Sequence, residues 1–123
     1  LVSGCSDPPR YMTKRDENVV AGLRMEQRHA NAVASMHGGM LLTLVDTALT
    51  LAAMKAAPKG QYAVTSTLTS DFIAPARLGD WVEAEVEVLR AGRSVIYLQC
   101  LVRAEGKLLL RSSASFQVVA PAA

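Results

Sequence analysis

The sequence is poor in aromatic residues and carries almost no excess of charge of one sign. Aromatic residues make up 5% of the 123 positions, too few for a platform on which nucleic-acid bases could stack. The net charge at pH 7 is only +2 and no basic cluster occurs along the chain, so we expect no nucleic-acid partner. Hydrophobic residues nevertheless make up 50%, which predicts one folded globular domain rather than a disordered chain.

Cysteines are also scarce. The only two, Cys5 and Cys100, lie far apart in the sequence and have no spacing typical of a metal site. Cys100 falls within an apolar strand pattern, which predicts a buried free thiol. Cys5 closes a segment, residues 1–5, that is similar to the cleavage box of a bacterial lipoprotein. Because no charged region and no apolar stretch precedes that segment, we expect a cytoplasmic protein.

No apolar run is long enough to suggest a membrane span. The longest such stretch, Met40–Met54, is too short to cross a bilayer and predicts a buried helix instead. Pro58 and Gly60 follow the stretch and would end that helix. A soluble chain can bury such a helix only by wrapping other elements around it, so we expect a core helix and no membrane partner.

Around that helix the residues follow the two-residue period of β-strands. A first strand is expected at Val19–Gln27, after an irregular lead-in over residues 1–18. Four antiparallel strands in a meander are expected after the helix, at 61–73, 81–90, 94–104 and 107–119, and residues 120–123 form a tail. The prediction is a single α+β domain over residues 19–119, in which a curved antiparallel sheet wraps around one long central helix.

Two of these strands also predict which side chains share a face. The strand at 61–73 is rich in β-branched residues, and strict alternation places Val64, Leu68 and Phe72 on one face. The threonines at 65, 67 and 69 then lie on the other face. The strand at 81–90 alternates apolar residues with three glutamates, which predicts one buried face and one solvated face.

Four polar residues interrupt the apolar helix: Thr43, Asp46, Thr47 and Thr50. At about 100° per residue they fall within an arc of about 100°, so they form one polar stripe. Threonines commonly form hydrogen bonds back to helix carbonyls. A carboxylate in the middle of an apolar helix is costly unless it is paired or exposed. Asp46 is therefore either a salt-bridged structural residue or a functional carboxylate, and we favour the second.

His37, Gly38 and Gly39 stand where this helix is expected to begin. A helix N-terminus offers free N–H groups and a partial positive charge, and glycines let a ligand atom approach the backbone closely. Such a place suits a polarised carbonyl oxygen or an oxyanion. A capping loop with a buried histidine is the alternative explanation.

The spacing between these two features carries a further prediction. Gly38 and Asp46 are eight residues apart, which corresponds to about 12 Å along one helix, so no small reacting group can touch both. If both act on one carbonyl, they must come from two chains whose helices lie side by side and antiparallel about a two-fold axis. The spacing therefore predicts a homodimer with two equivalent sites at its interface.

Three ordered motifs resemble those of hotdog-fold acyl-CoA thioesterases of the phenylacetate-degradation type, in the 4-hydroxybenzoyl-CoA thioesterase superfamily. The motifs are Asn31-x5-His37-Gly38-Gly39-x6-Asp46-Thr47-Ala48, Phe72-Ile73-Ala74-Pro75-Ala76-x2-Gly79-Asp80 and Ala91-Gly92-Arg93-Ser94. The resemblance covers residues 19–119. It implies a hotdog fold, hydrolysis of an acyl-CoA thioester to a carboxylic acid and free coenzyme A, and no metal or other cofactor. It also implies homodimers that associate into tetramers.

The resemblance implies a role for each predicted catalytic residue. Asp46 would act as the nucleophile or as a general base on water. The backbone N–H of Gly38 would polarise the thioester carbonyl. His37 and Asn31 would orient or hydrogen-bond the thioester, and Thr65 would position the attacking water.

Four further residues are assigned to substrate binding by the same resemblance. Ser66 replaces Thr65 in this assignment if the strand register is shifted by one residue. Gly39 lies next to the thioester site. Arg93 and Ser94 lie where the phosphates of coenzyme A commonly dock. A solvated turn charge is the alternative explanation of Arg93.

Two other functions remain open at this point. A hotdog dehydratase acting on a 3-hydroxyacyl thioester would use His37 as a base rather than as an orienting group. A non-catalytic acyl-CoA-binding module would keep the fold without the chemistry. No DNA-binding segment is present in the 123 residues, which argues against a self-contained regulator.

Overall fold

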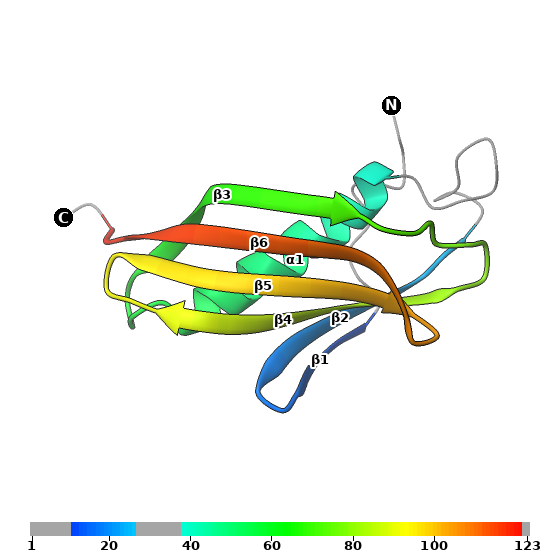
Figure 1. Ribbon diagram of the computed structural model, residues 1–123. Coiled ribbons are helices and arrows are strands. Elements are labelled where there is room, and N and C mark those ends of the chain that lie inside the picture. The colour runs from blue at the N-terminus through cyan, green and yellow to red at the C-terminus, as the bar shows by residue number, and fades with distance from the viewer. Residues whose placement is uncertain (1–10, 27–37, 122–123) are drawn as a thin grey trace.

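A computed structural model describes residues 11–26 and 38–121 and shows one antiparallel sheet with a helix against one of its faces (Figure 1). The elements are β1 (Tyr11–Arg15), β2 (Asn18–Arg24), α1 (Gly38–Ala56), β3 (Tyr62–Phe72), β4 (Trp81–Ala91), β5 (Val95–Ala104) and β6 (Lys107–Val119). Across the sheet the strands follow the order β1-β2-β4-β5-β6-β3. The predicted α+β class, with one long helix against an antiparallel sheet, is confirmed.

The core forms where one side of α1 is buried against the sheet. The buried residues of the helix are Met40, Leu41, Leu44, Val45, Ala48, Leu49, Ala52 and Ala53. They belong to the same apolar cluster as the inward side chains of the central strands, among them Val82, Ala84, Ile96 and Leu98. Complete burial of one leucine-sized side chain contributes roughly 1.5–3 kcal/mol, so this layer dominates the stability of the fold.

The helix is longer than the sequence predicted. It runs from Gly38 to Ala56, whereas the apolar stretch suggested Met40–Met54. With 19 residues it is long and apolar enough to pass as a membrane span, so the argument from length is wrong. Its burial against the sheet identifies it as the core helix of this domain.

The predicted irregular lead-in is wrong for residues 11–15, which form the edge strand β1. This strand pairs with β2 across a two-residue turn at Asp16 and Glu17, whose φ angles are 50° and 72°. Such turns usually carry asparagine or glycine, so a turn made of two acidic residues gave no recognisable signal. The strand predicted to be the first is therefore the second strand of the sheet.

The predicted four-strand meander is wrong at β3, because only β4, β5 and β6 follow one another as neighbours. β3 lies at the far edge beside β6, and the connection over residues 73–80 crosses the end of the sheet to reach β4 (Figure 1). Backbone hydrogen bonds fasten this connection to the end of β2: Gly79 N–H donates to Met25 O at 2.9 Å, and Met25 N–H donates to Asp80 O at 2.8 Å. Periodicity alone does not report strand order.

A β-bulge interrupts the alternation of β3. Thr65 pairs with Phe116 and Thr67 pairs with Ser115, so Ser66 is the extra residue between them. Directly opposed residues of an antiparallel pair point to the same face, and Phe116 is buried in the core that includes the helix. Thr65 therefore faces the helix side of the sheet.

This bulge makes part of the predicted face assignment wrong. Thr65 shares the helix side with Leu68 and Phe72, whereas Val64 lies on the outer side with the threonines at 67 and 69. An extra residue shifts the alternation by one position, and a sequence read in strict alternation does not show it. In β4 the predicted alternation of buried apolar residues with glutamates is confirmed from Val82 to Val86.

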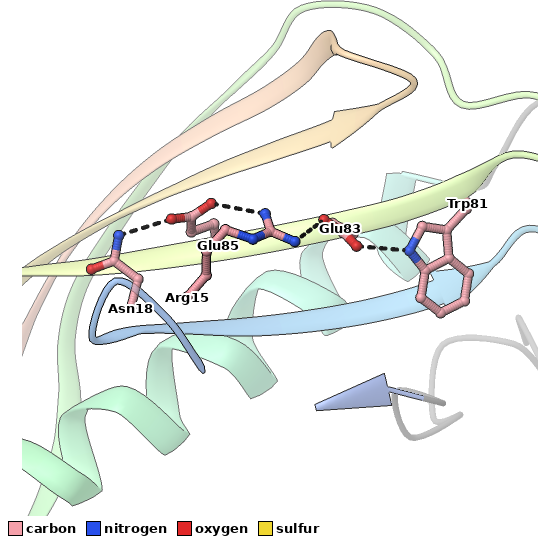
Figure 2. A network of polar contacts seen from close by, with 5 residues as sticks. All are labelled: Arg15, Asn18, Trp81, Glu83 and Glu85. Atoms are coloured by element: carbon pink, nitrogen blue, oxygen red, sulfur yellow. Dashed lines mark hydrogen bonds and ion pairs between the residues drawn. The ribbon is translucent and has the colours of Figure 1, made fainter. Parts of the chain in front are cut away.

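On the outer face, polar contacts fasten the β1–β2 hairpin to β4 (Figure 2). Arg15 donates hydrogen bonds to Glu83 at 3.0 Å and to Glu85 at 3.3 Å, so it reaches across β2 to the next strand. Asn18 donates to Glu85 at 2.9 Å, and Trp81 Nε1 donates to Glu83 at 2.9 Å. The Trp81 hydrogen bond, followed by Arg15, lowers the pKa of Glu83, and Glu83 in turn raises the pKa of Arg15.

Gly22 leaves the space that this network needs. A Cβ atom at Gly22 would lie 2.4 Å from Cζ2 of Trp81, which is far inside van der Waals contact. Arg24 also packs on the indole, because its guanidinium lies 5.2 Å from the ring centroid and donates to Gly79 O at 3.0 Å. The absence of a side chain in the middle of β2 therefore lets Trp81 lie across it.

We expect Glu83→Gln to weaken the fold at neutral pH and to have little effect in acid. The pKa of Glu83 is lowered on folding from its usual 4.5, so its stabilisation is complete above about pH 4.5 and is lost as the pH falls through the folded-state pKa. Urea unfolding across a pH series should show the largest difference in stability between wild type and Glu83→Gln near neutral pH, and that difference should shrink as the pH falls below the usual pKa of 4.5.

Glu105→Gln, in the β5–β6 turn, is the matched control for the loss of one carboxylate. Its effect on the free energy of unfolding should stay within about 0.5 kcal/mol, as for other exposed substitutions. A Glu83→Gln effect of equal size at every pH would contradict the proposed role of its charge.

Candidate functional site

One group of predicted site residues lies at the N-terminus of α1. The helix begins with Gly38 and Gly39, and its first turn contains no acidic side chain. The first N–H groups of a helix lack partners within the helix and carry the positive end of its dipole. The ring of Phe72, at the end of β3, lies 3.6 Å from the place where a Cβ of Gly38 would be. An apolar ring therefore borders one side of this helix end.

Asp46 is exposed on the polar stripe that the sequence predicted. Thr43 donates a hydrogen bond to Gly39 O at 2.9 Å and Thr47 donates to Thr43 O at 2.8 Å, as expected of helical threonines. Within residues 11–26 and 38–121, Asp46 has no ion-pair or hydrogen-bond partner. The carboxylate is thus accessible to a ligand or to a second chain.

In the structure, the helix N-terminus and Asp46 are as far apart as the sequence predicted. The helix is continuous from Gly38 to Ala56, so Gly38 and Asp46 are eight residues apart on one helix. That spacing corresponds to about 12 Å along the axis. Within one chain, the two groups cannot act on the same carbonyl.

Thr65 and Ser66 are exposed near the middle of β3. The bulge distinguishes them, because it turns Thr65 toward the helix side and leaves Ser66 as the unpaired extra residue. Of the two residues that the sequence offered for positioning water, Thr65 is therefore the one on the same side of the sheet as α1.

Arg93 and Ser94 form the turn between β4 and β5, at the opposite end of the sheet from Gly38 (Figure 1). Val118 N–H donates to Ser94 O at 2.8 Å, and Val118 pairs with Ala63 near the start of β3. The start of the helix instead lies against the last residue of β3. Ala63 and Phe72, which mark these two ends of the sheet, are nine residues apart on β3, which corresponds to about 30 Å.

The β4–β5 turn borders an open groove of about 500 Å³. Its lining residues are Arg90, Gly92, Arg93, Ser94, Val95 and Tyr97. A bulge between Val88 and Arg90 places Arg90 opposite Tyr97, on the outer face. Neither Arg90 nor Arg93 pairs with an acidic side chain in the described part of the chain, so both guanidinium groups can receive an anion. Sequence reasoning missed Arg90 and Tyr97 because alternation does not reveal this bulge.

Cys100 is a buried free thiol, as predicted. Burial raises its pKa to about 12, so the thiol stays protonated at neutral pH. A protonated thiol is a poor nucleophile, which excludes Cys100 as the reactive group. Within the described ranges, no group of three or more His, Cys, Asp or Glu side chains could hold a metal ion.

Asn31 and His37, two of the predicted catalytic residues, lie outside the described residues. The structure places the other predicted residues at separate positions on one chain. Gly38 and Gly39 stand at the start of the helix. The remaining residues lie along the helix, on β3 and at the β4–β5 turn: Asp46, Thr65, Ser66, Arg93 and Ser94.

Comparison with known proteins agrees with this architecture. A family model described as the thioesterase superfamily matches residues 34–110. The chain is 31% identical over 100 residues to a Pseudomonas aeruginosa protein named as an esterase, a match that covers 81% of this chain and 75% of that protein. It is 29% identical over 93 residues to human acyl-coenzyme A thioesterase 13, covering 74% of this chain and 66% of the human protein.

A solved structure shows the same fold. A thioesterase protein of Streptococcus pneumoniae, solved with coenzyme A, superimposes with a TM-score of 0.79 at 20% identity. The match covers 92% of this chain and 90% of the pneumococcal chain. The hotdog architecture predicted from the sequence is confirmed.

Proposed function

The chain belongs to the thioesterase superfamily and hydrolyses acyl-CoA thioesters, and we propose that each of its active sites is shared between two chains of a homodimer. Hydrolysis adds water across the bond between the acyl carbon and sulfur, giving a carboxylic acid and free coenzyme A. The observation that carries the proposal is the separation of about 12 Å between Gly38 and Asp46 on one continuous helix. A second helix, antiparallel to the first, would supply the missing half.

In this proposal, the helix N-terminus of one chain binds the thioester oxygen. Negative charge develops on that oxygen as the carbonyl carbon becomes tetrahedral, and the N–H of Gly38 points from the positive end of the helix. The ring of Phe72 borders this helix end, and if the second chain covers the exposed ring, the lower dielectric would strengthen the hydrogen bond to the developing charge. Gly39 has no side chain that could block the approaching substrate.

The second chain supplies Asp46, which either attacks the carbonyl carbon directly or removes a proton from an attacking water. Its exposed position without a described partner leaves the carboxylate available for either role. Thr65 of the same chain lies on the helix side of β3, where its hydroxyl can position water.

The β3 edge supports the two-chain arrangement. β3 is an 11-residue strand at one edge of the sheet, so one side of its backbone has no neighbouring strand in the described chain. Large apolar side chains are exposed on it and just after it: Tyr62, Val64, Leu68, Phe72 and Ile73. Long exposed edges of this kind pair with other chains. Antiparallel pairing of two β3 strands about a two-fold axis would bring the helices side by side, and the family resemblance extends the proposal to a dimer of dimers.

The same arrangement would unite the substrate-binding residues. Antiparallel chains bring the β4–β5 turn of one chain toward the helix N-terminus of the other. The groove at that turn offers two arginines without acidic partners among the described residues, and the exposed ring of Tyr97. Guanidinium groups bind phosphates, and an aromatic face can stack on a base, so the groove suits the nucleotide part of coenzyme A.

Mixed dimers provide the main test. Asp46→Asn removes the carboxylate, and Gly38→Pro removes one N–H at a helix position that tolerates proline. Each homodimer should lose about 100-fold or more in turnover, as when an oxyanion donor is removed. A mixed dimer keeps one site in which both groups are intact, so a random equimolar mixture should regain about a quarter of wild-type activity in a thiol-trapping assay.

Gly38→Ala is the matched control, because it keeps the N–H and its Cβ would make an ordinary contact with Phe72. This variant should remain active. Native mass spectrometry can verify that mixed dimers have formed. If they have formed and activity does not recover, the shared site is contradicted. Near-normal turnover of Asp46→Asn would contradict the role of the carboxylate.

Leu68→Lys tests the β3 edge. A charge in the middle of an exposed edge strand should prevent pairing, so we expect a monomer by light scattering and the loss of hydrolysis. Leu89→Lys is the control, because Leu89 lies on β4 and is 56% exposed, compared with 37% for Leu68. A dimer that persists in Leu68→Lys would place the interface elsewhere.

Arg93→Ala tests the nucleotide groove. Loss of an exposed charge contact should raise KM for an acyl-CoA about fivefold with little change in kcat. KM for the corresponding acyl-pantetheine, which lacks the nucleotide, should not change. Arg111→Ala is the control, because Arg111 pairs with Asp71 on the outer face at 3.3 Å. An equal effect of Arg93→Ala on both substrates would rule out nucleotide recognition by this turn.

A further inference from the structure

A second hollow lies between the β1–β2 hairpin and the C-terminal half of α1. Its volume is about 580 Å³, which is within the usual range of small-molecule sites. Its lining residues are Thr13, Lys14, Val19, Leu51 and Lys55. A smaller hollow of about 210 Å³ shares Lys14, Val19 and Lys55 with it, so the two adjoin. We call the combined space the lysine groove.

The lysine groove lies on the opposite flank of the helix from the proposed active site. Leu51 follows Asp46 by five residues, which corresponds to a rotation of about 140° around the helix axis. The groove is also bordered by β1 and β2, at the sheet edge opposite β3. A ligand there would touch neither the catalytic carboxylate nor the proposed dimer edge.

The floor of the groove is apolar. Val19 and Leu51 line the larger hollow, and the smaller one adds the aliphatic side chains Ala52, Ala56, Val86 and Val88. Leu51, in the C-terminal half of the helix, is 38% exposed, so its apolar surface is accessible. Covering such surface removes it from water at a gain of roughly 25 cal/mol per Å².

The mouth of the groove is cationic. Lys14 forms one ion pair, with Glu17 at 3.5 Å, and both side chains are more than half exposed. Exposed pairs of this kind contribute little, so Lys14 can exchange Glu17 for another carboxylate. Lys55, in the last turn of α1, has no acidic partner among the described residues. The groove therefore combines two ammonium groups and one weakly held carboxylate with an apolar floor.

We propose that the lysine groove binds a free fatty acid, with its carboxylate between Lys14 and Lys55 and its alkyl chain along Val19 and Leu51. A lysine stem can lie along apolar surface while its ammonium group stays in water, so both lysines can border the chain and still meet the carboxylate. An alkyl chain with one anionic end matches this division of apolar floor and cationic mouth. The inference goes beyond the proposed catalytic site and does not depend on it.

Titration calorimetry of the full chain with dodecanoate, below its micelle concentration, tests the proposal. We expect Lys14→Met and Lys55→Met each to weaken binding about three- to fivefold, as for loss of one exposed charge pair. Dodecanol, which has the same chain without the charge, should bind wild type and both variants equally. Lys59→Met is the matched control, because Lys59 is exposed in the turn after α1 and does not line the groove.

Leu51→Asn tests the floor and should weaken binding of both dodecanoate and dodecanol, with folding checked by circular dichroism. Dodecanoate binding should persist in Asp46→Asn and in the presence of saturating coenzyme A. Loss of binding under either condition would assign dodecanoate to the active site and overturn the proposal. Unchanged affinity in both lysine variants would overturn it as well, and so would binding of anionic phosphatidylglycerol vesicles without binding of dodecanoate.

Discussion

The burial of one side of α1 against the sheet is the interaction on which the rest of the structure depends. This burial determines which helix residues remain accessible to solvent, and Asp46 is one of the accessible residues. The helix is continuous from Gly38 to Ala56, so the distance between Gly38 and Asp46 cannot adjust to a substrate. A rigid spacer of about 12 Å within one chain is the physical reason to seek the second half of each site in another chain.

The two edges of the sheet are built differently, and the difference bears on assembly. Beside β1 the surface carries charged residues, and Arg15 ties the hairpin to β4. β3 instead exposes apolar side chains such as Leu68 and Phe72 along an edge that has no neighbouring strand in residues 11–26 and 38–121. Charged edges discourage pairing with another chain, whereas long apolar edges favour it. This asymmetry favours association through β3 and leaves the lysine groove beside β1 open.

The parts of the fold that could be predicted depend on local periodicity. The helix and β6 are long and strongly patterned, and Asp46 was visible as the one carboxylate in an apolar run. β1 escaped prediction because its turn, Asp16–Glu17, lacks the usual turn residues. The face of Thr65 and the position of Arg90 escaped because each lies next to a bulge, Thr65 just before one and Arg90 just after one. Strand order and the meeting of residues distant in sequence depend on tertiary packing, which no local pattern encodes.

The two flanks of α1 therefore carry different surfaces. One flank carries Asp46 at the proposed interface, and the other carries Leu51 and Lys55 beside the β1–β2 hairpin. Because the sheet holds the middle of the helix, neither surface can shift without disturbing the shared core. The proposed active site forms only when chains associate, whereas the lysine groove is complete within one chain. Catalysis should thus depend on protein concentration near the dimer dissociation constant, and fatty-acid binding should not.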